Sequence, residues 1–190
     1  MGRYSVIVIF NLSMLISVWS LSASRRIFRL GMLLVLIIFV ITGVKVFGDR
    51  QIIEPLRLLL VLVFDILSCL IAARNVFVWH RADLNSLVGA FCVYLLLGLI
   101  WAIMYQLLHL FGWAAFSGSL AEDGQPLFPA LTYFSFVTLA GLGYGDITPV
   151  GALVRTFAYL EGVIGQFYLA IMVASLVGNY SSHRINRESM

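Results

Sequence analysis

The stretch from Thr138 to Pro149, TLAGLGYGDITP, is where this sequence can do chemistry, although its side chains include almost no reactive group. Its centre alternates glycines with larger residues: Gly141, Leu142, Gly143, Tyr144 and Gly145. A chain that turns successive carbonyl oxygens toward one axis must alternate ordinary and left-handed backbone, which glycine adopts without strain. Carbonyl oxygens so arranged can replace the hydration shell of a cation. The pattern predicts a cation site made of backbone, with Tyr144 packed behind it.

The amino-acid composition places this segment in a membrane protein. Hydrophobic residues make up 62% of the chain and charged residues 11%, with a mean hydropathy of +1.01. Soluble domains are close to half apolar and a quarter charged. Two long stretches, Tyr4 to Ser24 and Leu84 to Ala121, contain no Asp, Glu, Lys or Arg. We therefore expect the chain to cross a membrane several times.

Hydrophobic runs of about 20 residues, the length that spans a bilayer, set the expected architecture. They cover residues 4–24, 28–48, 57–78, 86–112 and 150–179. Between the last two, the apolar part Pro126 to Ala140 is too short to cross, so it must lie in a loop or enter and return. Irregular backbone at membrane depth occurs only where it is buried in protein or lines a water-filled path. We predict a helix from Leu127 to Leu139 whose carbonyl end faces the glycines and favours a cation.

Arginines between the runs predict the orientation. Arg25, Arg26 and Arg29 place the first connection on the cytoplasmic side, and alternation from there opens the glycine-rich segment to the outside. The same charges argue against a cleaved signal peptide at residues 1–24, because cleavage would carry them across the membrane. The 12 Lys and Arg residues gather at the ends of apolar runs, so the net charge of +3 indicates topology and no nucleic-acid partner.

The residues from Leu131 to Pro149, LTYFSFVTLAGLGYGDITP, closely resemble the pore helix and selectivity filter of the tetrameric potassium channel family. The resemblance covers about Leu84 to Tyr180. The family's filter, Thr-Val-Gly-Tyr-Gly-Asp, corresponds here to Gly141, Leu142, Gly143, Tyr144, Gly145 and Asp146. The resemblance implies a homotetramer with no cofactor besides the permeant K+. The backbone carbonyls implied as its K+ ligands are those of Gly141, Leu142, Gly143 and Tyr144.

The expected fold class combines the apolar runs with this resemblance. It is an all-α membrane protein: a pore module of two transmembrane helices, a pore helix and a filter, preceded by about three transmembrane helices. We expect N-terminal spans in residues 1–82, the pore domain in 83–180 and a short cytoplasmic tail in 181–190. None of the first three runs has an arginine at every third position, so they do not resemble a voltage sensor. Whether a sixth helix stands upstream stays open.

The resemblance also assigns roles around the filter. Thr138, Tyr133 and Asp146 stand at positions that support it, and Gly165 stands where the family's inner helix has a hinge glycine. By analogy with the family's pore-lining stripe, helical periodicity from Gly165 would turn three further residues toward the cavity: Gln166, Leu169 and Val173. Close helix packing is an equally good interpretation of Gly165.

Two departures from the family pattern affect the expected ion selectivity. Gly141 stands where the family usually has a threonine whose hydroxyl helps form the innermost ion site, so one ring of ligands is missing. The sequence therefore predicts cation conduction more strongly than it predicts selectivity for K+. Tyr133 and Phe134 stand where two tryptophans often brace the filter, and phenylalanine cannot donate a hydrogen bond. We expect Tyr133 to reach Asp146 instead.

Ionisable residues inside membrane spans are candidate functional groups, and Asp65, Arg155 and Glu161 qualify. Glu161 lies one helical turn before Gly165 on the same face. Our hypothesis is that it stabilises the unusual filter or raises the cation concentration in the cavity. The alternative is a carboxyl group paired with an arginine or a polar group of a neighbouring helix.

The sequence therefore favours a K+-selective channel in a bacterial inner membrane, in contact with lipid and open to an unidentified regulatory partner. The alternatives are a weakly selective Na+/K+ channel, a non-conducting regulatory subunit and, remotely, an intramembrane serine protease using Ser117 or Ser119 with His109. No enzyme is expected. Cys69 and Cys92 lie in apolar runs without metal-ligand spacing.

Overall fold

The computed structural model describes residues 33, 35–38, 50–78, 84–118 and 127–188. Within these ranges the elements follow the order α3 (Arg50–Val78), α4 (Leu84–Leu110), β1 (Ala115–Gly118), α5 (Leu127–Leu139), β2 (Ile147–Val150) and α6 (Ala152–Glu188). The expected span 4–24 and most of the span 28–48 lie outside the described residues.

Three of the described helices are long and apolar enough to cross a membrane. The qualifying parts are Glu54–Arg74 of α3, Leu87–Leu110 of α4 and Ala152–Ser175 of α6. They correspond to the spans predicted at 57–78, 86–112 and 150–179, which are confirmed as candidate membrane helices. The α6 helix continues unbroken to Glu188, so most of the segment expected to be a tail is helical. The predicted helix from Leu127 to Leu139 is α5, with the same bounds.

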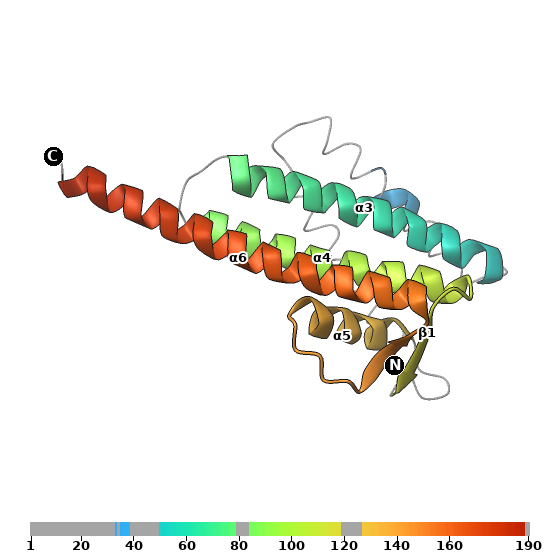
Figure 1. The fold of residues 1–190 in the computed structure, drawn as a ribbon. Helices are drawn as coiled ribbons and strands as arrows, with labels where there is room; N and C mark the ends of the chain where they lie inside the picture. Colours follow the sequence, from blue (N-terminus) through green and yellow to red (C-terminus); the bar gives the residue numbers. More distant parts are fainter. Residues whose placement is uncertain (1–32, 34, 39–49, 79–83, 119–126, 189–190) are drawn as a thin grey trace.

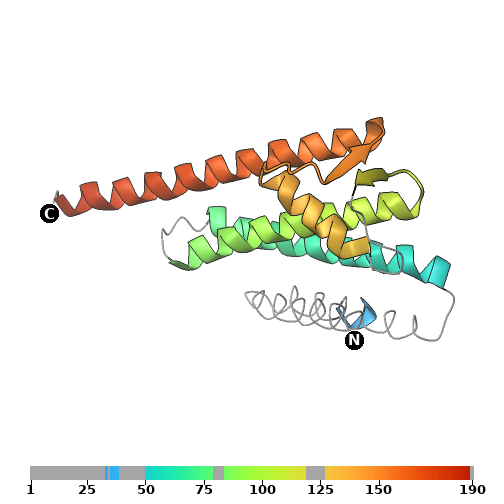
Figure 2. The same cartoon turned by 90° about the horizontal axis from the view of Figure 1, so that it is seen from below.

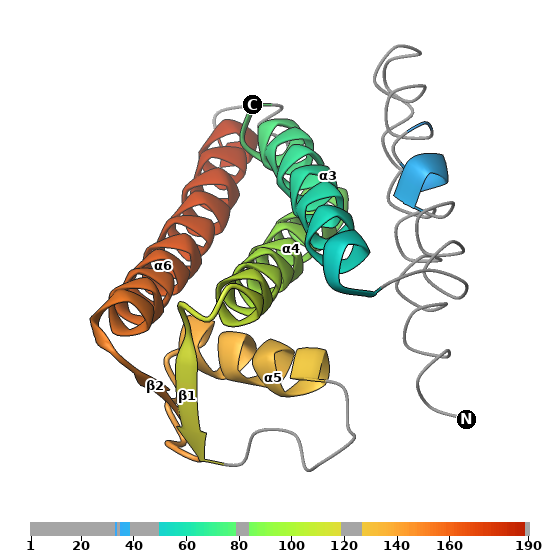
Figure 3. The ribbon, with the colours of Figure 1, turned by 90° about the vertical axis from the view of Figure 1, so that its right-hand side faces the viewer.

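The helix α4 is the centre of the described structure. It runs alongside α3 on one side and α6 on the other, and the shorter α5 packs against both α4 and α6 (Figures 1 and 3). Figure 2 shows α5 lying obliquely to the long helices. The glycine-rich segment leaves the end of α5 and returns to the start of α6, so these two helices set its position.

A small antiparallel sheet corrects the all-α expectation. Strands β1 and β2 pair in the register Ala115↔Val150 to Gly118↔Ile147, and the hydroxyl groups of Ser117 and Thr148 lie 2.7 Å apart across it. β1 follows the end of α4 after four residues and β2 lies just before the start of α6, so their pairing joins these two helix ends. The sheet closes the loop that contains α5 and the glycines.

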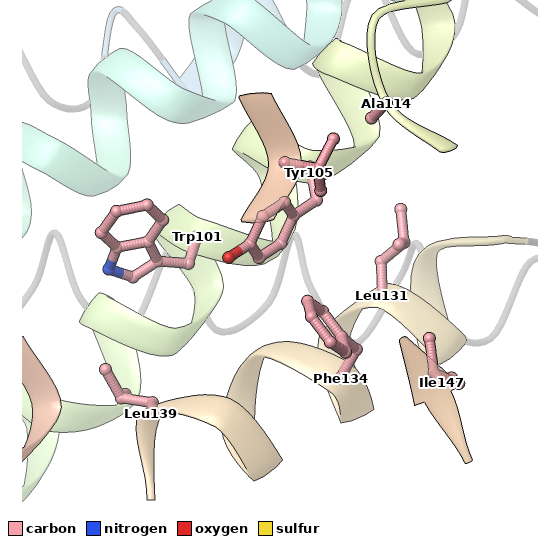
Figure 4. Packing of buried hydrophobic residues seen from close by; sticks show 8 residues of the cluster. Trp101, Tyr105, Ala114, Leu131, Phe134, Leu139 and Ile147 are labelled. Atoms are coloured by element: carbon pink, nitrogen blue, oxygen red, sulfur yellow. The ribbon is translucent and has the colours of Figure 1, made fainter. Parts of the chain in front are cut away.

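Aromatic side chains fix α5 against α4. Tyr105 of α4 contacts Phe134 of α5 and Phe116 of β1 edge to face, with ring centroids 5.3 and 5.7 Å apart, and Phe116 and Phe134 lie 5.3 Å apart. Figure 4 shows Trp101 and Tyr105 facing the side of α5 that carries Leu131, Phe134 and Leu139. Tyr105, Leu131 and Leu139 are fully buried. Edge-to-face pairs stabilise beyond the area they bury, so this cluster holds α5 at a defined angle.

Glycines allow the helix backbones to approach α5 closely. A Cβ at Gly98 of α4 would lie 2.5 Å from the ring of Phe136, and a Cβ at Gly165 of α6 would overlap the carbonyl oxygen of Leu139. Small residues at helix contacts are the usual device by which membrane helices pack tightly. The position of α5 therefore depends on the absence of a side chain at two points.

Replacing Gly165 with alanine tests this close approach. Gly165→Ala forces the backbone of α5 away from α6, and we expect a loss of about 1–3 kcal/mol in stability, the usual cost of overpacking. The measurement is the thermal unfolding midpoint of the purified protein in detergent.

Gly178→Ala is the matched control, because Gly178 lies on the same helix with no atom within 4 Å of its added Cβ. Removing a helical glycine in open space should leave the midpoint unchanged or raise it. Equal midpoints for the two variants would contradict the packing described.

Candidate functional site

The glycine-rich segment lies exposed at the end of α5. All residues from Gly141 to Asp146 are exposed in the protomer. Gly141, Gly143 and Gly145 have φ angles of 72°, 57° and 80°, the left-handed backbone that the sequence pattern requires. Tyr144 is 66% exposed, so within one protomer its side chain does not have the packing predicted for it behind the carbonyl groups.

Gly141 ends α5 in a Schellman motif. The Leu142 N–H donates to the Val137 carbonyl at 2.9 Å, and the Gly141 N–H donates to the Thr138 carbonyl at 3.0 Å. This pair of bonds places Gly141 at the position after the helix cap that takes up left-handed backbone. Glycine at 141 therefore has a local cause, since a β-branched threonine is strained in this conformation.

The next two carbonyls of α5 face α6. The Leu139 carbonyl oxygen lies against Gly165, and the Ala140 carbonyl accepts a hydrogen bond from Gln166 Nε2 at 3.3 Å. A Cβ built on Gly162 would lie 3.6 Å from the Thr138 carbonyl oxygen, an ordinary contact distance. The surroundings of Gly165 match its close-packing interpretation, while its role as a hinge stays a prediction. Farther along α6, Leu169 is half-buried and Val173 is exposed.

Glu161 joins all three helices of this region. Its side chain is fully buried, and its Oε2 accepts a hydrogen bond from the Tyr105 hydroxyl of α4 at 2.7 Å. Its Oε1 lies 2.5 Å from Ser135 Oγ of α5, and the same Oγ lies 2.7 Å from the Gly98 carbonyl oxygen. Glu161 therefore pairs with polar groups of neighbouring helices, and in this protomer it has no surface that could face a cavity.

The number of hydrogen atoms available in this cluster indicates how its donors and acceptors can be paired. Ser135 Oγ has one hydrogen but contacts two acceptors, the Gly98 carbonyl and Glu161 Oε1. Both contacts are favourable together when the Glu161 carboxyl carries a proton and donates it to Ser135 Oγ. Within the described residues the hydrogen-bond partners of Glu161 are neutral, and a buried ion without an opposite charge is costly. The cluster is thus a buried hydrogen-bonded tie between α4, α5 and α6.

Tyr133 meets Asp146, as expected from the sequence. Its hydroxyl hydrogen-bonds the Asp146 carboxylate, and this bond raises the pKa of Tyr133 above its ordinary value. Tyr133 belongs to α5 and Asp146 follows the last glycine of the segment. The contact therefore ties the outgoing end of the segment back to the helix from which it starts.

The remaining candidates lie apart from this site or have other partners. Asp65 is buried in α3, and Arg155 Nε donates to the Pro149 carbonyl at 3.2 Å. Ser117 pairs with Thr148, whereas His109 Nδ1 donates to the Ala114 carbonyl at 3.2 Å, so Ser117 and this histidine have separate partners. Ser119 lies outside the described residues. Within the described ranges no three His, Cys, Asp or Glu residues could hold a metal, and both cysteines are free thiols.

Sequence reasoning missed the partners of Glu161, namely Ser135, Tyr105 and Gly98. The available signal was weak: Tyr105 and Ser135 are each one of several polar residues in apolar helices, and Gly98 is a glycine within an apolar run. Their sequence separations from Glu161 give no helical spacing that would have linked them. Only the packing of α4, α5 and α6 brings them together.

Parts of this chain are similar to known proteins. The ion channel family matches residues 89–181. Protein LctB of Bacillus caldotenax is 34% identical over 108 residues, which cover 55% of this chain and 79% of that protein. Protein LctB of Geobacillus stearothermophilus is 33% identical over 101 residues, 52% of this chain and 75% of that protein.

A shorter match joins the chain to a potassium channel. The inward rectifier potassium channel Kirbac3.1 of Paramagnetospirillum magnetotacticum is 38% identical over 61 residues. That match covers 32% of this chain and 20% of the channel. No solved structure matches the chain significantly.

Substitution of Glu161 tests the three-helix tie. Glu161→Leu leaves the Tyr105 and Ser135 hydroxyl groups without this partner in a buried site, and each such loss costs about 1–3 kcal/mol. Glu161→Gln keeps both contacts, because the amide donates to Ser135 and accepts from Tyr105. We expect the thermal midpoint to fall clearly for Glu161→Leu and little for Glu161→Gln. Equal losses for both variants would show that the carboxyl is needed in its ionised form.

Alanine at Gly141 tests the helix cap and its surroundings. Gly112 ends α4 in the same motif, with a φ of 71° and no atom within 4 Å of an added Cβ. A left-handed alanine costs about 1–2 kcal/mol at either site. Only at Gly141 does the new Cβ also lie 2.8 Å from Gln166 Nε2. Gly141→Ala should therefore lower the midpoint more than Gly112→Ala, and the reverse order would rule out this arrangement.

Proposed function

This chain belongs to the same family as the LctB proteins and contains an ion channel domain at residues 89–181, and from that premise we propose that it forms a homotetrameric K+-selective channel. Passive conduction follows the electrochemical gradient, so no cofactor takes part. The observation that carries this proposal is the exposed segment Gly141 to Asp146, whose three glycines hold left-handed backbone at the end of a short buried helix.

The exposed backbone of the segment supports a cation as the ligand. Carbonyl groups that do not pair within the protein are expensive at membrane depth unless they face water or an ion. Residues 141–146 form neither helix nor strand, and all are exposed in the protomer. Their carbonyl oxygens are neutral, hard ligands suited to replacing water around a monovalent cation.

The surfaces that are exposed in one protomer, namely the glycine-rich segment and an apolar stripe on α6, support a homotetramer. A single segment can contact an ion from one side only, so several copies must surround it. An apolar stripe at spacing of four runs along α6: Tyr159, Val163, Phe167 and Ile171. The exposed fractions are 61, 47, 65 and 54%, which is large for apolar side chains of a helix that packs on others. In our proposal this stripe meets neighbouring subunits and lipid covers the outer helices.

Selectivity for K+ is supported by the Gly-Tyr-Gly-Asp stretch and by similarity to a relative whose name states potassium conduction. One observation favours a second candidate function. Gly141 contributes no side-chain oxygen, and its conformation is fixed by the helix cap. A filter with fewer ligands holds a dehydrated ion less specifically, which describes a weakly selective Na+/K+ channel.

The membrane helices make the chain an integral membrane protein, and its relatives come from bacteria. We propose that it resides in the bacterial plasma membrane, with the glycine-rich segment open to the outside. The ion channel family and the separate partners of Ser117 and His109 speak against the protease alternative.

The deciding experiment is the reversal potential of the reconstituted protein in planar bilayers, with KCl on one side and NaCl on the other. The proposal predicts a value near the K+ equilibrium potential. A value near zero with clear current would establish the weakly selective alternative. Absence of current from folded, tetrameric protein would contradict conduction and leave a regulatory subunit.

A matched pair of variants ties any current to the segment. Gly143→Ala places a side chain at a φ of 57° inside the segment, and we expect it to abolish the current. Gly112→Ala imposes a similar backbone strain at the end of α4, outside the segment, and should retain the current.

A further inference from the structure

The side chain of Gln166 reaches from α6 to the start of the glycine-rich segment. Its Nε2 lies 3.3 Å from the Ala140 carbonyl oxygen, immediately before Gly141. A Cβ built on Gly141 would lie 2.8 Å from the same Nε2 and 3.5 Å from Cδ. The carboxamide of Gln166 therefore occupies the space that a side chain at position 141 would need.

The partner of this amide fixes its orientation. A carbonyl oxygen can only accept a hydrogen bond, so the NH2 group of Gln166 must face Ala140. Its Oε1 then faces away from that carbonyl. Gln166 is exposed in the protomer, and no described residue donates a hydrogen bond to Oε1. Nε2 and Cδ are the Gln166 atoms within 4 Å of a Cβ built on Gly141, so Oε1 lies on the far side of the amide from that point, with its lone pairs available.

We propose that Gln166 supplies the side-chain oxygen that Gly141 lacks, so that its Oε1 is a ligand for the permeant monovalent cation at the α5 end of the segment. This inference rests on the proposed channel function and names a specificity-determining residue for it. In the tetramer, one such oxygen from each subunit completes a ring. An amide oxygen has the same neutral, hard character as the backbone carbonyls next to it.

Gly141 and Gln166 then form one functional unit although they are far apart in the sequence. The left-handed cap at Gly141 removes the local side chain, and the resulting space admits an amide from another helix. A side chain at 141 and the present position of Gln166 exclude each other. A purely structural role for Gln166, capping the Ala140 carbonyl, would affect stability without affecting which ion passes.

The first test removes the oxygen while keeping the length of the side chain. Gln166→Met has no strong donor or acceptor, and we expect the K+/Na+ permeability ratio to move toward one by about tenfold, the scale of one hydrogen bond. The ratio comes from bi-ionic reversal potentials of the full-length protein in planar bilayers.

Gln106→Met is the matched control. Gln106 is a glutamine of α4 whose Oε1 is buried without a hydrogen-bond partner among the described residues. The same chemical change made there, away from the segment, should leave the permeability ratio unchanged.

The second test moves the carboxamide from position 166 to position 141. Asparagine is the side-chain residue that best tolerates left-handed backbone, and it carries the same carboxamide. We expect Gly141→Asn and Gln166→Ala each to reduce the permeability ratio. The double variant should recover most of it, because the new amide fills the vacated space. Such non-additivity is the mark of two residues that act together.

The outcomes separate this inference from the proposed function. Absence of current from the folded wild-type protein would overturn both. A selective wild-type current whose permeability ratio is unchanged in Gln166→Met would overturn this inference alone, even if the thermal midpoint fell. Should Gln166→Met fail to assemble, the comparison between Gln166→Ala and the double variant decides: strictly additive losses would refute the shared role.

Discussion

The last carbonyl groups of a helix have no intrahelical donor, and those of α5 end against another helix, α6. The rest of the described structure depends on how this constraint is met. Val137 and Thr138 are satisfied by the cap at Gly141. The Leu139 carbonyl is covered by the bare backbone of Gly165, and the Ala140 carbonyl receives the amide of Gln166. The path of the glycine-rich segment is consequently set by α6 as much as by its own sequence.

The other side of α5 is held by a combination of aromatic packing and a buried hydrogen-bonded tie. Tyr105 takes part in both, since its ring packs on Phe134 while its hydroxyl binds Glu161. A hydroxyl or carboxyl left alone in such surroundings would be costly, so the three partners require one another's positions. Movement of α6 relative to α4 would disturb this tie and the cap contacts together. These contacts therefore link the position of α6 to the start of the glycine-rich segment.

In the segment itself, the backbone of the glycines and the contacts at the two ends have different roles. Its glycines provide left-handed conformation, its ends are tied by the cap and by the contact between Tyr133 and Asp146, and its centre stays exposed. An exposed centre between fixed ends suits a role in which the backbone itself is the ligand. The channel function we propose uses this arrangement without any reactive side chain. For the same reason, the sequence contained no catalytic motif that predicted an enzyme.

The sequence by itself determined the features that depend on neighbouring residues. Apolar runs located α3, α4 and α6, the bounds of α5 were predicted to the residue, and the glycine pattern indicated where left-handed backbone would occur. The contact of Tyr133 with Asp146 was also anticipated, because a recognisable motif fixes their spacing.

Tertiary structure alone decided the partners of Glu161, the pairing of β1 with β2 and the fit between Gly141 and Gln166. These contacts join residues on different elements, and no local periodicity records which faces of two helices will meet. Gly141 shows the difference most clearly. Its type suggested a missing ligand, and local hydrogen bonds make it the cap of α5. Packing decided that a side chain from α6 occupies the space it leaves, because a backbone without a Cβ allows another helix to approach.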